Sequence, residues 1–369
     1  MNEDKAARFH RLQRRCFWFS VATRAFTLLA LVPGGLARGI RELAVSLTGT
    51  SASAPATVAA FTLLVLLVLE LVALPQRFYQ VFVLERRYGL SDVSLRVWLV
   101  NELKGLGVGV VLVLTAAEFV YVALARWPIW WWAATAAAGA LAVIGLARLT
   151  PIVLLPLFYR CKPLDRATLR SRIESLSQRA GVPVLGVYEW SLGEKTRRAN
   201  AALVGTGRSR RILLSDTLLA HYSDDEIEVI LAHELGHHAH RDIRNGLVIE
   251  TILIAVACAA AAGALHFLWR PLGLEGPTDV AGLPLLALTA GILSFLTTPV
   301  LNAWSRRNEH RADRFALRLT GRPDAFVSAL RRLAAQNLAE ERPSAATLWL
   351  FHTHPPFEQR IQAARAFLS

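Results

Sequence analysis

The sequence predicts a mainly α-helical, multi-pass membrane protein that also carries a small α+β domain. Hydrophobic residues make up 54% of its 369 residues and charged residues only 19%. The apolar residues are gathered into long runs, and two polar blocks lie on either side of the last runs. A soluble chain of this length would instead hold two or three domains, with apolar residues spread through each of them.

Six runs are candidate membrane spans, because about 20 apolar residues are needed to cross the hydrocarbon core of a bilayer. They cover residues 17–33, 57–74, 105–124, 129–149, 248–268 and 280–304. The first run is the weakest, since it is short and contains Arg24. It follows a basic stretch, as in a signal peptide, but no small-residue cleavage site comes after it. We therefore expect a retained span.

The formal net charge of +13 is distributed in a way that predicts the topology. Five basic residues precede the first span and five more fill the loop 76–104, whereas the alternate loops hold at most two each. Basic loops of membrane proteins stay in the cytoplasm, so the N-terminal tail 1–16, this loop and both polar blocks are expected there. Six crossings then return the C-terminus to the cytoplasm. The lipid bilayer, rather than a nucleic acid, explains the basic charge.

The two polar blocks, residues 159–247 and 305–369, are expected to form one domain around the spans of residues 248–304, while residues 17–158 hold the first four spans. In the first block, residues 165–180 have helical periodicity. Other runs of that block read as short strands: residues 184–190, 201–204 and 210–214. Gly205-Thr206-Gly207 suits a hairpin turn between the last two strands. The second block reads as helices with breaks at residues 321–323 and 354–356.

Residues His233 to His237 read His-Glu-Leu-Gly-His within one predicted helix. Ser223 fits the N-cap and Glu226 the third helical position of a capping box. Two histidines four apart leave one face of a helix a turn apart, where a single metal ion can bridge them. Glu234 then lies beside the open position of the metal and can take a proton from bound water. The pattern is typical of zinc hydrolases, and the alternative is a surface helix with two solvated histidines.

A catalytic zinc ion takes three protein ligands and a water, so another element must supply a third ligand. Glu309, at the end of the last span, is the best candidate. A solvated helix charge beside Arg306 and Arg307 is an equally weighted alternative on spacing alone. Asp313 lies one turn further along the same side, where it can hydrogen-bond a ligating imidazole.

Several short motifs occur from about residue 74 to the C-terminus. They are Leu74-Pro75, Glu85-Arg86-Arg87-Tyr88-Gly89-Leu90, Leu155-Pro156-Leu157-Phe158, Arg197-Arg198-Ala199-Asn200-Ala201, the metal motif, Glu309-x-x-Ala312-Asp313 and His354-Pro355-Pro356. In these motifs and their order the chain resembles the type I CAAX prenyl endopeptidases, which are multi-pass membrane zinc proteases of the gluzincin class. The eukaryotic members have seven spans, and the six counted here lack the first.

The resemblance implies a gluzincin-like zinc-protease domain and a water-filled chamber enclosed by the spans. The implied ligands of one Zn²⁺ ion are His233, His237 and Glu309. The resemblance further implies that Asn200, before an edge strand, holds the substrate backbone and that His354 stabilises the oxyanion. Arg360 would grip the substrate main chain or its C-terminal carboxylate. From the residues alone, these three would be a loop asparagine, a turn histidine and a surface arginine.

The function expected on these grounds is that of an integral-membrane zinc metalloendopeptidase at the boundary between membrane and cytosol. The resemblance implies removal of the C-terminal tripeptide of lipid-modified proteins, and a membrane-protein quality-control protease of the HtpX type is the alternative. A transporter would explain Glu70 and Glu118 within the spans, but not the metal motif. A catalytically silent scaffold would not need an intact ligand set. The arginine- and alanine-rich composition with one methionine suggests a bacterial inner membrane.

Overall fold

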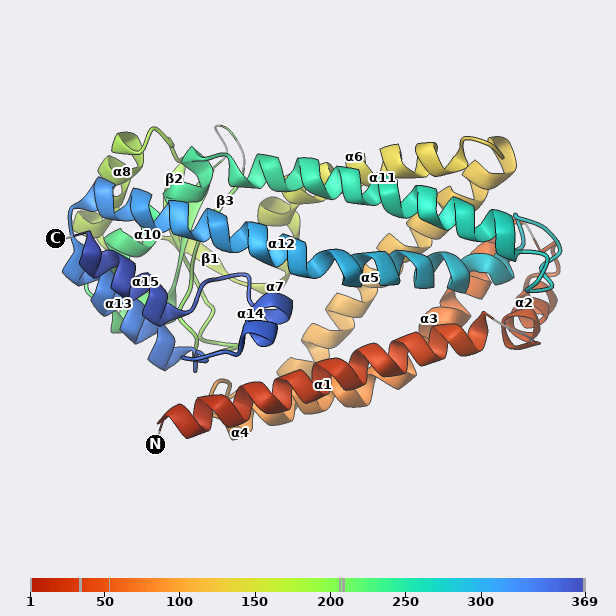
Figure 1. Cartoon of the computed structure of the whole chain (residues 1–369), viewed down its shortest axis with the longest axis horizontal. Coiled ribbons are helices and arrows are strands. Elements are labelled where there is room, and N and C mark those ends of the chain that lie inside the picture. Colours follow the sequence, from red (N-terminus) through yellow and green to blue (C-terminus); the bar gives the residue numbers. More distant parts are fainter. Residues whose placement is uncertain (1, 33–34, 53, 206, 208–209, 368–369) are drawn as a thin grey trace.

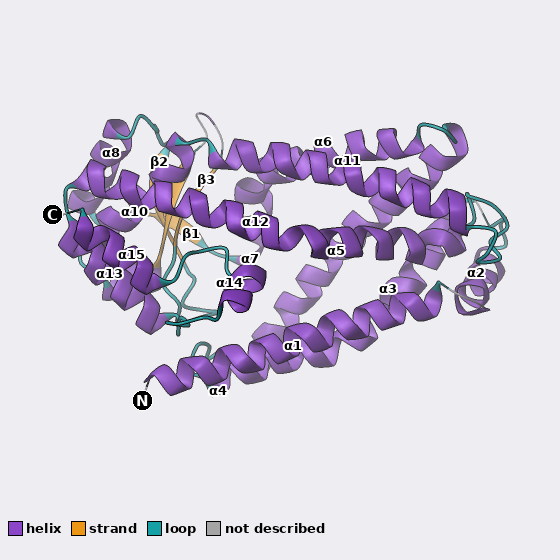
Figure 2. Cartoon of the chain, in the orientation of Figure 1, coloured by secondary structure: helices purple, strands orange, loops and turns teal. Residues whose placement is uncertain are grey.

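Membrane-length helices form the long axis of the protein, and a small mixed domain lies at one end. The computed structural model describes residues 2–32, 35–52, 54–205, 207 and 210–367. Figure 1 shows both chain termini at the end that carries the small domain, and Figure 2 shows the strands gathered there. The prediction of a mainly helical membrane protein with a small sheet is confirmed.

Within the described residues, five helices are long and apolar enough to cross a membrane, and a bent pair makes a sixth when it is counted as one span. The five helical segments are Pro55–Arg87, Leu95–Arg126, Trp131–Phe158, Asp242–Leu268 and Val280–Thr320. Their main helices are α3 (Pro55–Arg77), α5 (Leu95–Arg126), α6 (Trp131–Leu149), α11 (Asp242–Leu268) and α12 (Leu283–Thr320). A short 3-10 turn (Val280–Gly282) precedes α12. The long C-terminal extension of α12 carries Glu309 out of the membrane part into the small domain.

The bent pair consists of α1 (Asn2–Leu31) and α2 (Gly35–Thr48), whose axes differ by 72°. The residues expected as an N-terminal tail form the first half of α1. The helix α2 was not predicted, because its run of apolar residues is too short and too mixed with arginine for a span. Its Arg41 is buried and lies 2.7 Å from Asp279 and 2.8 Å from Glu275, which ties α2 to the loop before α12.

The segment expected as a loop over residues 76–104 is largely helical. After α3, a π-helical segment (Phe78–Leu84) continues into α4 (Glu85–Arg87), so only residues 88–94 separate it from α5. Pro75 lies inside α3 and has no amide hydrogen to donate to the preceding turn. This favours the wider turns of the π-helical segment that follows. A second π-helical segment (Thr150–Leu154), which contains Pro151, joins α6 to α7 (Leu155–Phe158).

A four-stranded sheet with the order β1-β2-β4-β3 forms the framework of the small domain. Its strands are β1 (Cys161–Pro163), β2 (Gly186–Trp190), β3 (Ala201–Val204) and β4 (Arg211–Ser215). The central strands β2 and β4 are parallel, and each outer strand is antiparallel to its neighbour. Three strands lie where the sequence predicted them, whereas β1 was missed because it is short and exposed. Thr206 and residues 208–209 of the predicted hairpin turn lie outside the described residues.

Six helices complete the domain: α8 (Ala167–Arg179), α9 (Asp216–His221), α10 (Asp224–Ala239), α13 (Pro323–Gln336), α14 (Ala345–Phe351) and α15 (Phe357–Ala366). One buried cluster joins α8, the sheet, α10, the end of α12, α13 and α15. The two polar blocks therefore share one hydrophobic core. Both predicted helix breaks are confirmed, since α12 ends at Gly321 with a φ of 62° and α15 begins after Pro356.

Candidate metal centre and substrate cleft

The two histidines of the motif lie on α10, whose first turn is held by a capping box. The Ser223 hydroxyl accepts a hydrogen bond from the Glu226 amide, and the Glu226 carboxylate accepts one from the Ser223 amide at 2.8 Å. The cap predicted from the sequence is confirmed. One turn apart on the same face, His233 and His237 bring their Nε2 atoms to 3.2 Å from each other.

Close packing of α10 against α12 brings Glu309 to the two histidines. A Cβ atom at Gly236 would lie 3.1 Å from the Cα of Ala312 and 3.3 Å from its carbonyl oxygen, so a larger residue would push the helices apart. One turn before Ala312, Glu309 places Oε1 3.2 Å from His237 Nε2. Its Oε2 lies 3.3 Å from His233 Nε2. The glycine of the motif thus sets the distance between the helices that supply the cluster.

The cluster has the spacing and the chemistry of a tetrahedral metal site. Ligand atoms bound about 2.0–2.1 Å from a zinc ion lie about 3.3–3.4 Å from one another. The two Nε2 atoms are 3.2 Å apart, and a different Glu309 oxygen faces each of them, Oε1 at 3.2 Å from His237 and Oε2 at 3.3 Å from His233. Each imidazole turns Nδ1 toward a carboxylate, so each Nε2 presents a lone pair. Glu309 Oε2 is buried and has no hydrogen-bond partner among the described residues. Two imidazole nitrogens and a carboxylate thus converge within 4.8 Å of one another, and a donor set of this kind fits a zinc ion.

A carboxylate and an arginine lie behind His233. Its Nδ1 lies 2.8 Å from Asp313 Oδ1, the position that helical spacing suggested for Asp313. Arg360 donates to both oxygens of Asp313, from Nε at 2.8 Å and from Nη2 at 2.6 Å. The Arg360 side chain is only 8% exposed, and its Nη1 lies 4.0 Å from Glu309 Oε2. That Arg360 contacts the substrate stays a prediction. Its Nε and Nη2 are bonded to Asp313, so Nη1 is the nitrogen available for such a contact.

A second carboxylate–arginine pair, which no local sequence pattern predicted, lies behind His237. His237 Nδ1 lies 3.0 Å from Asp242 Oδ2, and Arg311 donates to Asp242 Oδ1 at 2.6 Å. Asp242 lies beyond the end of α10, so helical spacing gave no reason to pair it with His237. Arg241 has a left-handed φ of 61°, which reverses the chain and starts α11 with Asp242 beside the metal helix.

The electrostatics of the cluster favour a bound cation. Burial lowers the pKa of His233, but the carboxylates of Asp313 and Glu309 outweigh it and raise this pKa to about 9. Burial raises the pKa of Asp313, yet Arg360 and His233 bring it down to about 2. Burial likewise opposes ionisation of Glu309, while the two imidazoles hold its pKa well below the usual range. Both carboxylates are therefore ionised, and a proton or a metal ion supplies the positive charge.

A cavity of about 800 Å³ opens beside the cluster and is lined by Glu234 and His354. Burial raises the pKa of Glu234, and the neighbouring imidazoles of His233 and His237 only partly oppose this. A carboxylate whose pKa is raised binds a proton more strongly, as a general base requires. His354 lies in the loop before α15 with its side chain 61% exposed and its Nε2 3.3 Å from Glu309 Oε1.

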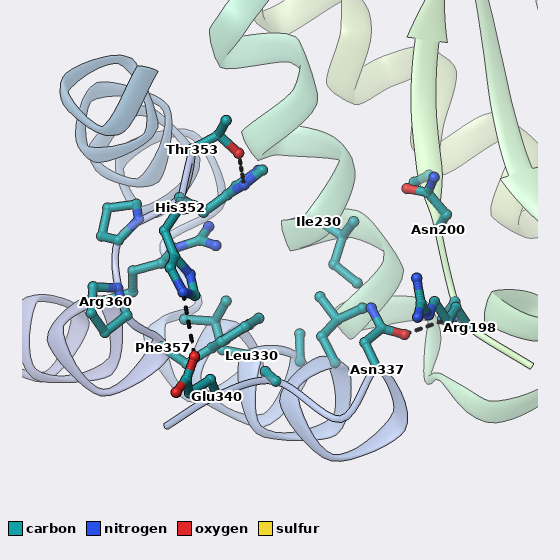
Figure 3. A pocket seen from close by; sticks show the side chains of 18 of the residues that line it. Arg198, Asn200, Ile230, Leu330, Asn337, Glu340, His352, Thr353, Phe357 and Arg360 are labelled. Carbon is teal, nitrogen blue, oxygen red and sulfur yellow. Dashed lines mark hydrogen bonds and ion pairs between the residues drawn. The ribbon is translucent and has the colours of Figure 1, made fainter. Parts of the chain in front are cut away.

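The edge strand β3 forms another side of this cavity. Figure 3 shows Asn200 on the strand side, across the cavity from the loop that carries His352 and Thr353. The Asn200 backbone bonds to Ser215 of β4 through both its amide and its carbonyl, at 3.0 Å each, and its side chain is exposed. The free side of β3 can therefore pair with an extended peptide.

His238 contacts one backbone carbonyl on the free edge of β3, and no sequence pattern predicted this contact. Its Nε2 lies 3.1 Å from the carbonyl oxygen of Leu203. The residue directly follows the metal ligand His237, so this contact joins the metal helix to the edge strand. It also shortens the length of β3 that remains open to another chain.

Two family models together cover nearly the whole chain. One, described as peptidase family M48, matches residues 163–368. The other, described as CAAX prenyl protease N-terminal with five membrane helices, matches residues 2–160. The chain belongs to the M48 peptidases. The resemblance to CAAX prenyl proteases that its motifs indicated is confirmed.

Relatives of this M48 peptidase include proteins of both kinds weighed above. It is 28% identical over 304 residues to a probable CAAX prenyl protease 1 of Schizosaccharomyces pombe, across 80% of this chain and 62% of the relative. It is 36% identical over 219 residues to the uncharacterized metalloprotease YhfN of Bacillus subtilis, across 58% of this chain and 51% of the relative. It is 29% identical over 214 residues to protease HtpX of Pseudomonas syringae, across 53% of this chain and 70% of the relative. The matches thus span about half of YhfN and under two thirds of the S. pombe protein.

The fold of this M48 peptidase is also that of a solved structure. Ste24p of S. mikatae superposes with a TM-score of 0.87 at 21% sequence identity, over 98% of this chain and 89% of that chain. The agreement covers the membrane helices as well as the small domain, so both parts share one architecture with that protein.

Proposed function

We propose that this M48 peptidase is an integral-membrane zinc endopeptidase that hydrolyses peptide bonds where the membrane meets the cytosol. The observation that carries the proposal is the convergence of His233, His237 and Glu309 next to a cavity that His233 and Glu234 line. Two imidazole nitrogens and a carboxylate within 4.8 Å of one another are suited to hold a cation, and a buried carboxylate beside them is suited to move a proton. Membership of a peptidase family supports the same reading.

In this mechanism His233, His237 and Glu309 hold the zinc ion, which when bound acidifies a water molecule and polarises the scissile carbonyl. Glu234 takes the proton from the attacking water and delivers it to the leaving amine. His354 donates a hydrogen bond to the oxyanion as it forms. Its exposed position on a loop lets it approach a substrate that already fills the cleft.

The substrate is held in an extended conformation along β3. Main-chain hydrogen bonds to this edge do not depend on the side chains of the substrate, and the Asn200 side chain adds a further contact to its backbone. Apolar residues line the same cavity: Ile230, Leu330 and Phe357. They provide room for an apolar side chain next to the cleaved bond.

The small domain and both termini lie at one end of the long axis, which fits the cytoplasmic side assigned by the basic loops. We place the chain in a bacterial inner membrane, with the bilayer as its surroundings. Its substrate is the C-terminal peptide of a lipid-modified protein. Similarity to HtpX favours a second candidate, the degradation of membrane proteins in quality control.

The test uses the purified full-length protein and its Glu234→Gln variant, with the exposed Glu341→Gln as a matched control. The substrates are a farnesylated C-terminal peptide, the same peptide without its lipid, and an unfolded membrane protein. We expect one zinc ion per chain in all three proteins. The rate of cleavage should fall by about 10²–10⁴ in Glu234→Gln only.

The pattern of cleavage decides between the candidates. Preference for the farnesylated peptide supports the first, and cleavage of the membrane protein alone supports the second. Zinc binding without cleavage of any of the three substrates would indicate a silent scaffold. Full activity in Glu234→Gln would defeat the assignment of the base.

A further inference from the structure

A second cavity, of about 840 Å³, is built on the part of α12 that leaves the membrane. Its lining residues on α12 recur every three or four positions and so share one face of the helix. They include Trp304, Arg307, Arg311, Arg314 and Leu317. Ala363, Ala364 and Phe367, at the end of the chain, line the cavity from α15 and beyond. Asp313 and Arg360, which lie behind His233, also line this cavity, whereas the peptidase mechanism uses none of the other lining residues directly.

The cavity carries positive charge that the protein does not neutralise. Arg307 and Arg314 are exposed and form no ion pair or hydrogen bond within the described part of the chain. Arg311 donates through Nη2 to Asp242 and Asn308, while its Nε is buried and has no partner there. The one acidic residue of the described lining, Asp313, is already bound on both oxygens by Arg360. At least two arginines thus remain free for an anion.

The position of the cavity along α12 matches the headgroup layer of a bilayer. The last apolar run ends at Trp304, and tryptophan is favoured at the interface between hydrocarbon and water. At 1.5 Å per residue, Arg307 lies about 5 Å beyond this tryptophan and Arg311 about 10 Å beyond it. The headgroup layer is about 5–8 Å thick on each side of the hydrocarbon core. The first arginine therefore stands at the level of the lipid phosphates.

Apolar and basic residues are also arranged in the order that a phospholipid presents. Trp304 stands at the membrane end of the cavity, where the glycerol and upper acyl carbons lie. Arg307 follows on the same helix face at the level of the phosphates, where its planar guanidinium group can bind two phosphate oxygens at once, and Arg314 lies about 10 Å further toward the water.

We propose that this cavity binds the headgroup of an anionic phospholipid, with Arg307 on its phosphate, Trp304 beside its glycerol backbone, and Arg314 adding positive charge on the water side of the phosphate. The ligand belongs to the bilayer and not to the substrate, so the site is independent of the proposed peptidase function. Arg311 lines this cavity and also donates to Asp242, the carboxylate behind His237. A lipid bound here is therefore connected to the metal centre through Arg311 and Asp242.

The test measures retention of lipid by the full-length protein in detergent, using native mass spectrometry. Phosphatidylglycerol and phosphatidylcholine with identical acyl chains are offered at equal concentration to the wild type and to Arg307→Gln/Arg314→Gln. The matched control is Arg331→Gln/Arg342→Gln, which removes the same charge from two exposed arginines that do not line this cavity. We expect the wild type and the control to retain phosphatidylglycerol. The cavity variant should bind it about 30-fold more weakly, because each arginine near an anionic headgroup contributes about fivefold.

Two results would overturn the proposal. One is equal retention of the two lipids by the wild type, and the other is an equal loss in the cavity variant and the control. A competition arm with inorganic phosphate separates a lipid site from a free-anion site. Displacement of phosphatidylglycerol by millimolar phosphate would show that the site recognises the phosphate group alone and would also overturn the lipid assignment. Melting temperature and zinc content, measured on each variant, show that a loss of lipid is not a loss of fold.

Discussion

Asp242 offers the sharpest test of how the metal centre is held. Its two oxygens lie 3.0 Å from His237 Nδ1 and 2.6 Å from Arg311 Nη2. In Asp242→Asn the shape is kept, but the amide nitrogen must face one of these two donors and the negative charge is lost. A hydrogen bond to a charged group contributes about 1.5–3 kcal/mol. Zinc affinity should therefore fall by about 10–100-fold, the range found when the partner of a ligating imidazole is removed.

The protein should remain folded, because the Arg311 side chain is 41% exposed and water can replace its lost partner. The assay is competition for zinc between the purified protein and a chromogenic chelator, with thermal unfolding as a check of the fold. The control is Asp92→Asn, which makes the same chemical change in a carboxylate that also pairs with an arginine, Arg197, but is 66% exposed. Wild-type zinc affinity in Asp242→Asn, or an equal loss in the control, would refute the reasoning.

Three further predictions concern the scaffold. Ser223→Ala should lower the free energy of unfolding by about 1 kcal/mol, since it removes the capping box of the metal helix, and Ser223→Asp should restore most of it; equal melting temperatures for all three proteins would contradict this. His238→Ala should cost about 1 kcal/mol and speed amide exchange in β3, because the carbonyl of Leu203 loses its partner; unchanged exchange would argue that the contact does not hold the strand. If the spans enclose water, hydrophilic thiol reagents should label cysteines placed beside Glu70 and Glu118 in a chain whose own three cysteines are replaced; absence of labelling would indicate a dry bundle.

The features that the sequence predicted correctly are those encoded within a few residues. Apolar runs of sufficient length predicted the spans, and short β-like runs predicted three of the four strands. The capping box at Ser223 and the break at Gly321 were predicted for the same reason, since each depends on the chemistry of one helix turn. Short or mixed segments were missed: α2 has no long apolar run, and β1 is only three residues long.

The sequence by itself determined that two imidazoles share one helix face, because the period of the helix requires it. Only the tertiary structure decided which carboxylates meet them. Glu309 reaches His237 because Gly236 lets α10 and α12 approach closely, and Asp242 does so because the chain reverses at Arg241. Contacts between residues far apart in the chain depend on how helices pack, and no local sequence pattern specifies the distance between two packed helices.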